Sequence, residues 1–176
     1  MKKIKLIYGS DTGNTYHVIN TYIIPELENY NYDYDLIEIR DITPNDWIDN
    51  THFILGIPTW YDGELQSDWE EYFEEFKQVD FKNKKVALFG LGDQIGYDEW
   101  FCDGIGILAE IVEKNKGTVI GKINRDDTYD FETIPKVLID DNTFWGLPLD
   151  WDNQEELTEK RCINWFKQLE KEWNKQ

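Results

Sequence analysis

The stretch KIKLIYGSDTGNTY at residues 3–16 constrains the fold more than any other part of the chain. Its apolar run is short and bounded by turn-forming residues, which is typical of a strand buried in a parallel sheet. A helix follows at once, because apolar side chains at three- and four-residue spacings form one stripe, at Val18, Ile19, Tyr22 and Ile23. We expect Pro25 to kink or end this helix early. The stretch therefore predicts a strand, a tight loop and a helix in direct succession.

The loop between this strand and helix has the composition of an anion-binding site. Side-chain donors and one glycine gather in it, at Ser10, Thr12, Gly13, Asn14 and Thr15. The start of a helix adds unpaired N–H groups and about half a positive charge, so a phosphate can be bound without a basic side chain. None is available, because no lysine or arginine lies between Lys5 and Arg40. The alternative is an ordinary turn capped by serine or threonine.

Two common phosphate-binding loops are excluded by the same residues. A nucleoside triphosphatase loop ends in Gly-Lys-Ser/Thr, and the Rossmann dinucleotide loop reads G-x-G-x-x-G. Neither pattern occurs at residues 8–15. The remaining candidate is one phosphate monoester held by uncharged donors, as a mononucleotide cofactor would supply.

Composition limits the partners. The chain has 176 residues, a size typical of one domain over residues 1–176, and its 18 basic and 36 acidic residues give a formal net charge of −18. So acidic a chain repels nucleic acid and anionic membranes, and it favours partners with basic patches. Residues 61–80 alone carry eight acidic side chains and one lysine. Such a run is usually a solvated helix face, and it can also be a docking face.

The N-terminus and the cysteines predict the compartment. Met1 to Lys5 leads directly into the first strand, so we expect no targeting leader and a cytoplasmic monomer. Cys102 and Cys162 lie far apart and outside any C-x-x-C pattern, which predicts two reduced thiols and neither a metal site nor a redox dithiol. His17 and His52 are too few and too separated for a metal site, and we expect one on a helix surface and the other at the start of a strand.

Strands and helices alternate along the rest of the chain. Short apolar runs predict further strands at residues 34–39, 53–57, 85–89, 118–121 and 143–149. Apolar stripes predict helices that start near residues 65, 101 and 152, the last with a capping contact at Glu155. Residues 41–49 form a short helix or a polar connection, and the polar residues 122–143 are interpreted as an insertion that splits the last strand. The alternation predicts a three-layer α/β fold with a parallel sheet.

Three unusual loops leave the carboxyl ends of the first, third and fourth strands, at residues 10–15, 58–63 and 90–97. Ligands of open parallel sheets bind outside these ends, so we expect the loops to converge. The second loop places Trp60 and Tyr61 near a glycine, and the third places Tyr97 beside another. Glycine allows close approach of the backbone and an aromatic ring offers a flat face, a combination that suits a planar ligand.

The loops carry motifs that resemble the flavodoxin family. They are S-D-T-G-N-T at 10–15, P-T-W-Y-D-G-E-L-Q-S-D-W at 58–69, G-L-G-D-Q-I-G-Y at 90–97 and L-D-W-D-N-Q-E-E-L-T at 149–158. These four motifs, in this order, span nearly the whole chain from residue 10 to residue 158, and the split fifth strand resembles the long-chain subgroup. The resemblance implies a flavodoxin-like, doubly wound α/β sandwich with five parallel strands in the order 2-1-3-4-5, and flavin mononucleotide (FMN) as cofactor.

The resemblance also implies the cofactor-binding residues. The phosphate would be held by Ser10, Asp11, Thr12, Gly13, Asn14 and Thr15, with the Asp11 side chain turned to solvent or capping the loop. Trp60 and Tyr97 would flank the isoalloxazine ring, Tyr97 the more coplanar. The other implied contacts are Pro58, Thr59, Tyr61, Asp62, Gly63, Leu91, Gly92, Asp93 and Cys102. Thr59 and the backbone near Asp93 and Cys102 would meet the ribityl chain and the pyrimidine edge, and Asp150 and Asp152 would lie near the ribityl hydroxyls.

A one-electron carrier is the function that this resemblance implies. Long-chain flavodoxins substitute for ferredoxin, and their partners are flavodoxin or ferredoxin reductases, photosystems and other ferredoxin-dependent enzymes, which they meet through acidic faces. In the family a backbone carbonyl turns toward flavin N5 and stabilises the neutral semiquinone; here it is that of Tyr61. The turn moves Asp62 toward positive φ, which Asp tolerates less well than Gly. We expect Cys102 to contribute its backbone, because nearby acids raise its pKa.

Two other classes of protein share the fold. An FMN-dependent NAD(P)H reductase needs a second substrate pocket and a nicotinamide site, and no motif resembles one. A phosphoacceptor signalling domain needs an Asp at the end of the third strand, where this chain has Gly56, Ile57 and Pro58.

Overall fold

A parallel sheet forms the centre of the protein. The computed structural model describes residues 3–175, so Met1 and Lys2, on which the expectation of no leader partly rests, lie outside the described residues. The strands of the main path are β1 (Lys3–Tyr8), β2 (Asp33–Glu38), β3 (His52–Trp60), β5 (Lys85–Gly92) and β10 (Leu147–Asp150). They pair in parallel in the order β2-β1-β3-β5-β10. The predicted fold class and strand order are confirmed.

The fifth strand is split, as predicted. β6 (Thr118–Ile120) pairs with the first half of β5, and β10 pairs with the second half. Between them the insertion forms its own antiparallel sheet from β7 (Ile123–Asn124), β9 (Thr143–Phe144) and β8 (Leu138–Asp140). The expectation of one strand over residues 143–149 was therefore wrong in its first part. Gly146 separates the two parts, and a Cβ there would lie 2.1 Å from the Leu88 carbonyl oxygen, so only glycine lets the chain re-enter the sheet there.

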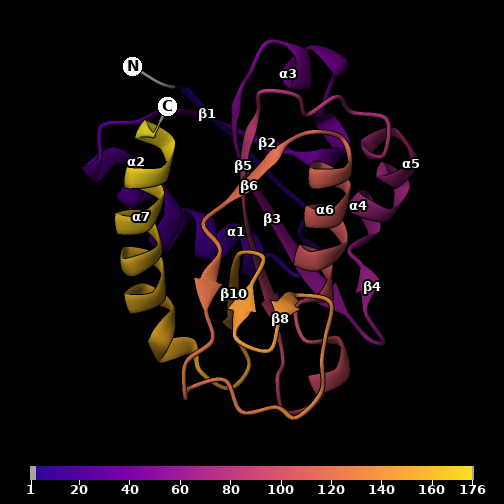
Figure 1. The fold of residues 1–176 in the computed structure, drawn as a ribbon, viewed down its shortest axis with the longest axis vertical. Helices are drawn as coiled ribbons and strands as arrows, with labels where there is room; N and C mark the ends of the chain where they lie inside the picture. Colours follow the sequence, from indigo (N-terminus) through magenta and orange to yellow (C-terminus); the bar gives the residue numbers. More distant parts are fainter. Residues whose placement is uncertain (1–2, 176) are drawn as a thin grey trace.

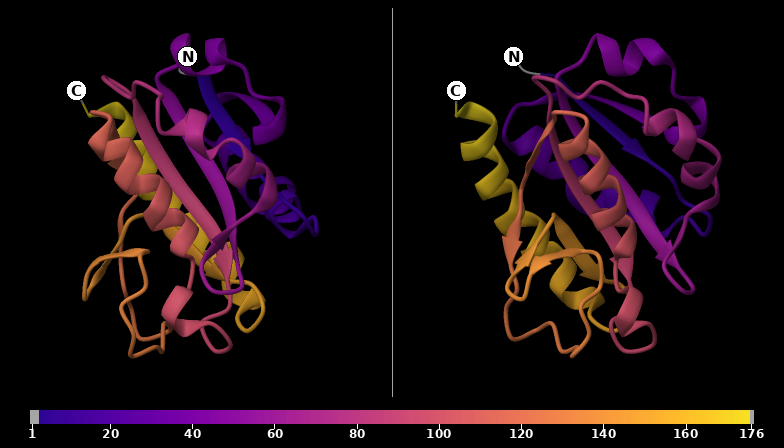
Figure 2. Two further views of the ribbon diagram at one scale, coloured as in Figure 1. Left: turned by 90° about the vertical axis from the view of Figure 1, so that its right-hand side faces the viewer. Right: turned by 45° about the vertical axis from the view of Figure 1, so that its right-hand side comes forward.

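Helices cover both faces of the sheet (Figures 1 and 2). One face carries α1 (Asn14–Val18), η1 (Ile19–Ile23), α2 (Ile24–Asn29) and α7 (Thr158–Asn174). The other carries α3 (Pro44–Ile48), α4 (Ser67–Glu71), α5 (Phe73–Phe76) and α6 (Asp103–Lys114). Short 3-10 turns lie at η2 (Ile39–Asp41), η3 (Asp98–Trp100) and η4 (Glu155–Leu157), and β4 (Glu64–Leu65) pairs back onto β3. None of the helices in the described part of the chain is long and apolar enough to cross a membrane.

The two faces have separate apolar cores because successive side chains of a strand point to opposite sides. Leu6 and Ile54 pack toward α7, whereas Ile7 and Leu55 pack toward α6. All four side chains are fully buried. Burial on both faces explains why the strands are continuous apolar runs in the sequence.

Two local predictions were wrong, and one of the two effects expected of Pro25 is excluded. The first helix does not end at Pro25: a π-helical turn, η1, ends at Ile23, and α2 carries the proline and continues to Asn29; such a wide turn accommodates a residue without an N–H group. The helix predicted from residue 65 breaks at Tyr72 into α4 and α5. Glu155 lies in η4, and α7 begins three residues later without a side-chain cap.

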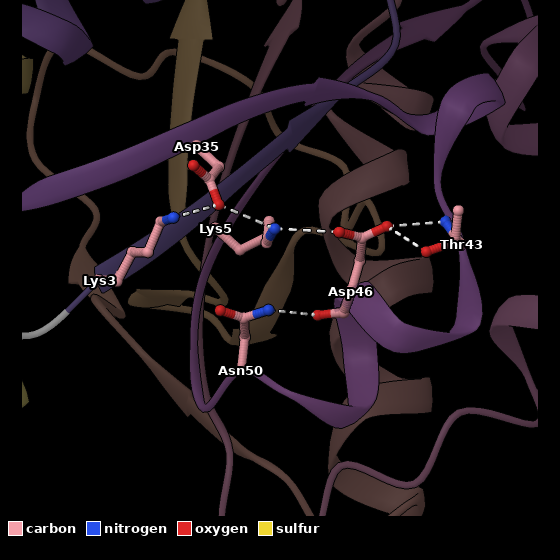
Figure 3. Close-up of polar contacts among 6 residues, drawn as sticks. All are labelled: Lys3, Lys5, Asp35, Thr43, Asp46 and Asn50. Atoms are coloured by element: carbon pink, nitrogen blue, oxygen red, sulfur yellow. Dashed lines mark hydrogen bonds and ion pairs between the residues drawn. The ribbon is translucent and has the colours of Figure 1, made fainter.

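A buried lysine joins three elements on one side of the sheet (Figure 3). The Lys5 side chain is 7% exposed, and its Nζ lies 3.0 Å from Asp35 Oδ2 on β2 and 3.0 Å from Asp46 Oδ1 on α3. Asp46 also accepts hydrogen bonds from Thr43 N and Thr43 Oγ1, which caps α3. The pKa of Asp35 is lowered, first by the hydrogen bond from Lys3 and also by the hydrogen bond from Lys5. Burial of the carboxylate raises the pKa but does not outweigh these two bonds.

We predict that Lys5→Met lowers the free energy of unfolding by about 2 to 4 kcal/mol, because it leaves two carboxylates without their shared cation. Lys3→Met is the matched control: Lys3 also pairs with Asp35, but its side chain is 52% exposed, so we expect a loss of about 0.5 kcal/mol or less. Urea unfolding measures both. Because the folded pKa of Asp35 lies below its ordinary value of 3.8, its contribution is complete above that value and is lost as the pH falls through the lowered pKa. Equal losses in the two variants would contradict the prediction.

Candidate functional site

A cleft of about 390 Å³ lies at the carboxyl ends of β1, β3 and β5. The three predicted loops all contribute to it. The first loop supplies Thr12, Asn14 and Thr15, the second supplies Pro58, Thr59, Trp60 and Tyr61, and the third segment supplies Leu91, Gly92, Asp93, Tyr97 and Cys102. The structure therefore brings together most of the residues that the sequence singles out.

Five of the predicted residues do not line the cleft: Ser10, Asp11, Gly13, Asp62 and Gly63. Ser10 Oγ accepts a hydrogen bond from Gly13 N at 3.0 Å, so these two residues shape the loop from within. Asp11 is exposed to solvent, which is one of its two expected placements, but its carboxylate is also bound to another loop. Its Oδ1 accepts hydrogen bonds from Gln66 Nε2 at 2.8 Å and Ser67 Oγ at 2.7 Å.

The cleft also has walls that the sequence reasoning missed. Trp100, Phe101 and Trp151 line it, and all three lie within or next to the quoted motifs. Their position beside those motifs was the signal that could have found them. Of the two acids proposed for the ribityl hydroxyls, Asp152 lines the cleft, whereas Asp150 is 1% exposed and lies behind it.

One end of the cleft is built to receive an anion. Gly13, at φ 87°, precedes α1, and its positive φ turns the chain directly into the helix. The unpaired N–H groups of the first helical turn lie next to Thr12, Asn14 and Thr15. The Oγ1 atom of Thr15 is buried and has no hydrogen-bond partner among the described residues. None of the lysines and arginines in the described part of the chain lines the cleft, so an anion here would be held by neutral donors.

The other end is built from aromatic side chains on a hairpin and a loop. Trp60 ends β3, and β4 pairs back onto Thr59 and Trp60. The buried Nε1 atom of Trp60 lacks a hydrogen-bond partner within residues 3–175. Tyr97 is 41% exposed at the opposite loop. Buried donors without partners are costly, so their presence on one cleft indicates a polar, partly aromatic ligand.

Burial raises the pKa of three titratable groups at the cleft, but the net shift differs from one group to the next. Burial raises the pKa of Asp93, but hydrogen bonds from Gly96 N, Asn153 and Ile95 N outweigh it, so the pKa is lowered. Burial, with the charges of Asp93 and Asp150, raises the pKa of Asp152. The pKa of the Cys102 thiol is raised well above its ordinary value, first by burial and then by Asp150. The expected direction for Cys102 was right, but burial and not the neighbouring acids is its main cause.

Comparison with known proteins assigns the family. The flavodoxin family model matches residues 6–165 of the chain. The chain belongs to the flavodoxin family. The insertion with its antiparallel sheet makes it a long-chain flavodoxin.

Relatives are similar over almost their whole length. The flavodoxin of Buchnera aphidicola is 44% identical over 172 residues, covering 96% of each chain. Flavodoxin 1 of Escherichia coli is 40% identical, covering 95% of this chain and 92% of the relative. Among solved structures, Fusobacterium nucleatum flavodoxin bound to flavin mononucleotide superimposes with a TM-score of 0.88 at 31% identity, covering 98% of this chain and 99% of that one.

In this flavodoxin the insertion braces the loop that carries Tyr97. Gln94, which is 3% exposed, is the centre of the contact. Its Nε2 donates to Asp150 Oδ2 at 2.7 Å, and its Oε1 accepts from the Asp130 N–H of the insertion at 2.7 Å. Thr133 Oγ1 donates to the Asp98 carbonyl at 2.9 Å, one residue after Tyr97. The insertion thus stabilises the third loop through these hydrogen bonds.

We predict that Gln94→Leu lowers the free energy of unfolding by about 2 to 4 kcal/mol, because it leaves the Oδ2 atom of Asp150 and the Asp130 N–H without the partner that Gln94 provides. Hydrogen exchange at the Asp130 amide should accelerate in parallel. Gln154→Leu is the control: Gln154 contacts the same insertion through the Thr128 carbonyl, but this bond is exposed, and we expect a loss below about 1 kcal/mol. An unchanged exchange rate of the Asp130 amide in Gln94→Leu would show that Gln94 does not hold the insertion against the third loop.

Proposed function

We propose that this flavodoxin carries single electrons between redox proteins on one molecule of FMN bound in the cleft. The observation that carries the proposal is the combination of the α1 N-terminus with two buried atoms on one cleft, Thr15 Oγ1 and Trp60 Nε1, that have no hydrogen-bond partner within residues 3–175. A phosphate would satisfy Thr15 Oγ1, and a polar group of the same ligand would satisfy Trp60 Nε1. The flavodoxin family and its FMN-bound relative support the same ligand.

The loop at residues 10–15 would hold the phosphate. Thr12, Asn14 and Thr15 line the cleft and would donate to the phosphate oxygens together with the N–H groups of the first turn of α1. Ser10 and Gly13 would act from within the loop, through the hydrogen bond that fixes its shape. Neutral donors can bind a dianion in this way because hydrogen bonds to a charged acceptor are about twice as strong as neutral ones.

The aromatic end would hold the ring and its side chain. Trp60 and Tyr97 would flank the isoalloxazine, while Thr59 and the backbone near Asp93 and Cys102 would contact the ribityl chain and the pyrimidine edge. Thr59 Oγ1 already accepts a hydrogen bond from Gly104 N at 2.9 Å, which leaves its own proton to donate. A Cβ at Gly92 would lie 2.9 Å from Cys102 Sγ, so glycine permits the close packing of this wall.

FMN supplies reversible one-electron chemistry when bound, and the chain's own residues set its energy. Acidic side chains near the cleft disfavour added negative charge. One unit charge about 10 Å away contributes roughly 0.4 to 1.7 kcal/mol at an effective dielectric of 80 to 20. Several such charges in a chain of net charge −18 lower the potential at which a second electron enters. The aromatic walls exclude water and strengthen this effect.

This flavodoxin is an electron-transfer protein and not an enzyme, and its partners are redox proteins. Exposed apolar side chains rim the cleft, with Tyr61 65%, Ile95 74% and Tyr97 41% exposed. The acidic segment at residues 61–80 starts at this rim, at Tyr61, and continues away from it through β4, α4 and α5. Exposed apolar contacts on so acidic a chain suit partners with basic faces, such as a flavodoxin or ferredoxin reductase, a photosystem or another ferredoxin-dependent enzyme. We place the protein in the cytoplasm, as a monomer; the free thiols of Cys102 and Cys162 fit a reducing compartment.

The proposal is tested on the purified protein by its visible spectrum, the mass of the ligand released on denaturation, and reduction by a one-electron donor. A flavin spectrum, the mass of FMN and electron transfer to a one-electron acceptor are expected. Oxidation of NAD(P)H by the protein alone would favour a reductase instead, and failure to bind added FMN would reject the proposal.

We predict that Trp60→Ala and Tyr97→Ala each weaken FMN binding by about 1 to 3 kcal/mol, the range measured for aromatic rings stacked on nucleic-acid bases. Fluorescence titration of the apoprotein measures the dissociation constant. Tyr30→Ala removes an aromatic ring outside the cleft, and we expect it to leave the constant unchanged. If Tyr30→Ala weakens binding as much as the two cleft variants, the stacking assignment is wrong.

We predict that Asp62→Gly widens the gap between the first and second reduction potentials. In the structure the Tyr61 carbonyl accepts a hydrogen bond from Gly63 N at 2.9 Å. Turning this carbonyl toward the cleft moves Asp62 to positive φ, which costs Asp about 1 kcal/mol more than Gly. This is roughly 40 mV for one electron. Asp62→Ala removes the same charge but keeps a Cβ that disfavours positive φ, and it is the control; an equal gap in both variants would count against the turn.

A further inference from the structure

Asp11 is the one acidic side chain in the predicted phosphate loop, and it is hydrogen-bonded to another loop. Its Oδ1 accepts from Gln66 Nε2 at 2.8 Å and from Ser67 Oγ at 2.7 Å. Burial raises the pKa of Asp11, but hydrogen bonds from the Ser67 side chain, Gln66 and the Ser67 backbone outweigh it, so the pKa is lowered. The carboxylate is therefore ionised at neutral pH while engaged with Gln66 and Ser67.

Gln66 is built into the structure as a connector. It is fully buried, and its Oε1 accepts a hydrogen bond from Trp69 N at 3.2 Å, at the start of α4. It sits against Gly9, where a Cβ would lie 1.9 Å from Gln66 Oε1. Only glycine at position 9 allows this approach. The contacts with Gly9 and with Trp69 N thus fix the Gln66 side chain in the position from which its Nε2 donates to Asp11.

Gln66 also directly follows β4, the strand that pairs with Thr59 and Trp60. The Gly56 carbonyl of β3 accepts from both Gly9 N at 3.2 Å and Trp69 Nε1 at 3.1 Å. The Asp11–Gln66 hydrogen bond therefore links the phosphate loop to the residue that directly follows the Trp60 hairpin, and the bonds to the Gly56 carbonyl hold the same elements together.

We propose that Asp11 is a positioning residue, whose carboxylate fastens the phosphate loop to the Trp60 hairpin and so holds the two ends of the FMN site at their mutual spacing. The inference rests on the proposed function. It assigns Asp11 a role that its charge alone would not allow, because a carboxylate one residue from Thr12 repels a phosphate dianion. Removing the charge favours FMN, whereas removing the hydrogen-bond acceptor disfavours it.

Two substitutions at Asp11 separate these effects. Asp11→Asn and Asp11→Ala remove the same charge, but only Asn keeps an oxygen that Gln66 and Ser67 can donate to. Fluorescence titration of each apoprotein with FMN and with riboflavin, which lacks the phosphate, gives four dissociation constants. We expect Asp11→Ala to bind FMN at least about tenfold more weakly than Asp11→Asn, the effect of losing hydrogen bonds to the oxygen of Asp11. Riboflavin should show a difference in the same direction, because the Trp60 hairpin is displaced.

Ser67→Ala is a second variant, which tests the same contact even if Asp11→Ala fails to fold. It removes one of the two donors from an exposed side chain, and we expect FMN to bind about threefold more weakly. Equal FMN constants for Asp11→Asn and Asp11→Ala would overturn the inference. So would a difference confined to FMN with riboflavin unchanged, because Asp11 would then act at the phosphate alone. If the wild-type chain binds neither flavin, the proposed function fails first and this inference falls with it.

Discussion

Parallel strands place all their carboxyl ends at one edge of a sheet, and the site of this flavodoxin depends on that geometry. β1, β3 and β5 are adjacent, so the loops that follow them meet although residues 12, 60 and 97 are far apart in sequence. The same arrangement presents the N-terminus of α1 to the cleft. The proposed anion site and the aromatic end of the cleft thus lie side by side, and none of the basic side chains of residues 3–175 lines them.

The lack of basic side chains in the cleft fits the charge of the whole chain. A protein of net charge −18 gains solubility and attracts basic partners, but it opposes the binding of an anionic ligand. Backbone N–H groups and hydroxyls resolve this conflict because they hold an anion at short range and add nothing to the long-range field. The acids near the cleft then act on the redox energy of the ligand and on the approach of partners.

Much of the fold could be predicted because its strands are buried on both faces. Runs such as residues 53–57 and 85–89 have few alternatives to a central parallel strand. The positions of the loops followed from the strands, and the motifs then indicated the family. Features that depend on tertiary contacts could not be predicted. Thr143–Phe144 pairs within the insertion because Gly146 lies against the Leu88 carbonyl, and nothing local in the sequence indicates this. Pro25 is tolerated because of the π-helical turn before it.

The roles of the side chains that connect the loops could not be predicted from the sequence either. Gln66 and Gln94 look like ordinary polar residues in their motifs, yet both are buried and each links two loops of the site. Their roles depend on partners 36 to 56 residues away along the chain. A motif can therefore identify the loops that meet a ligand, while the side chains that fix the spacing of those loops emerge only from the folded structure.

The central claim is that uncharged donors at the first turn of α1 bind the phosphate of FMN. The most direct test is to compare the affinity of the apoprotein for FMN and for riboflavin at several salt concentrations. Several hydrogen bonds to a charged acceptor should make FMN bind about a hundredfold or more tightly than riboflavin. Equal affinities for the two flavins would contradict the account.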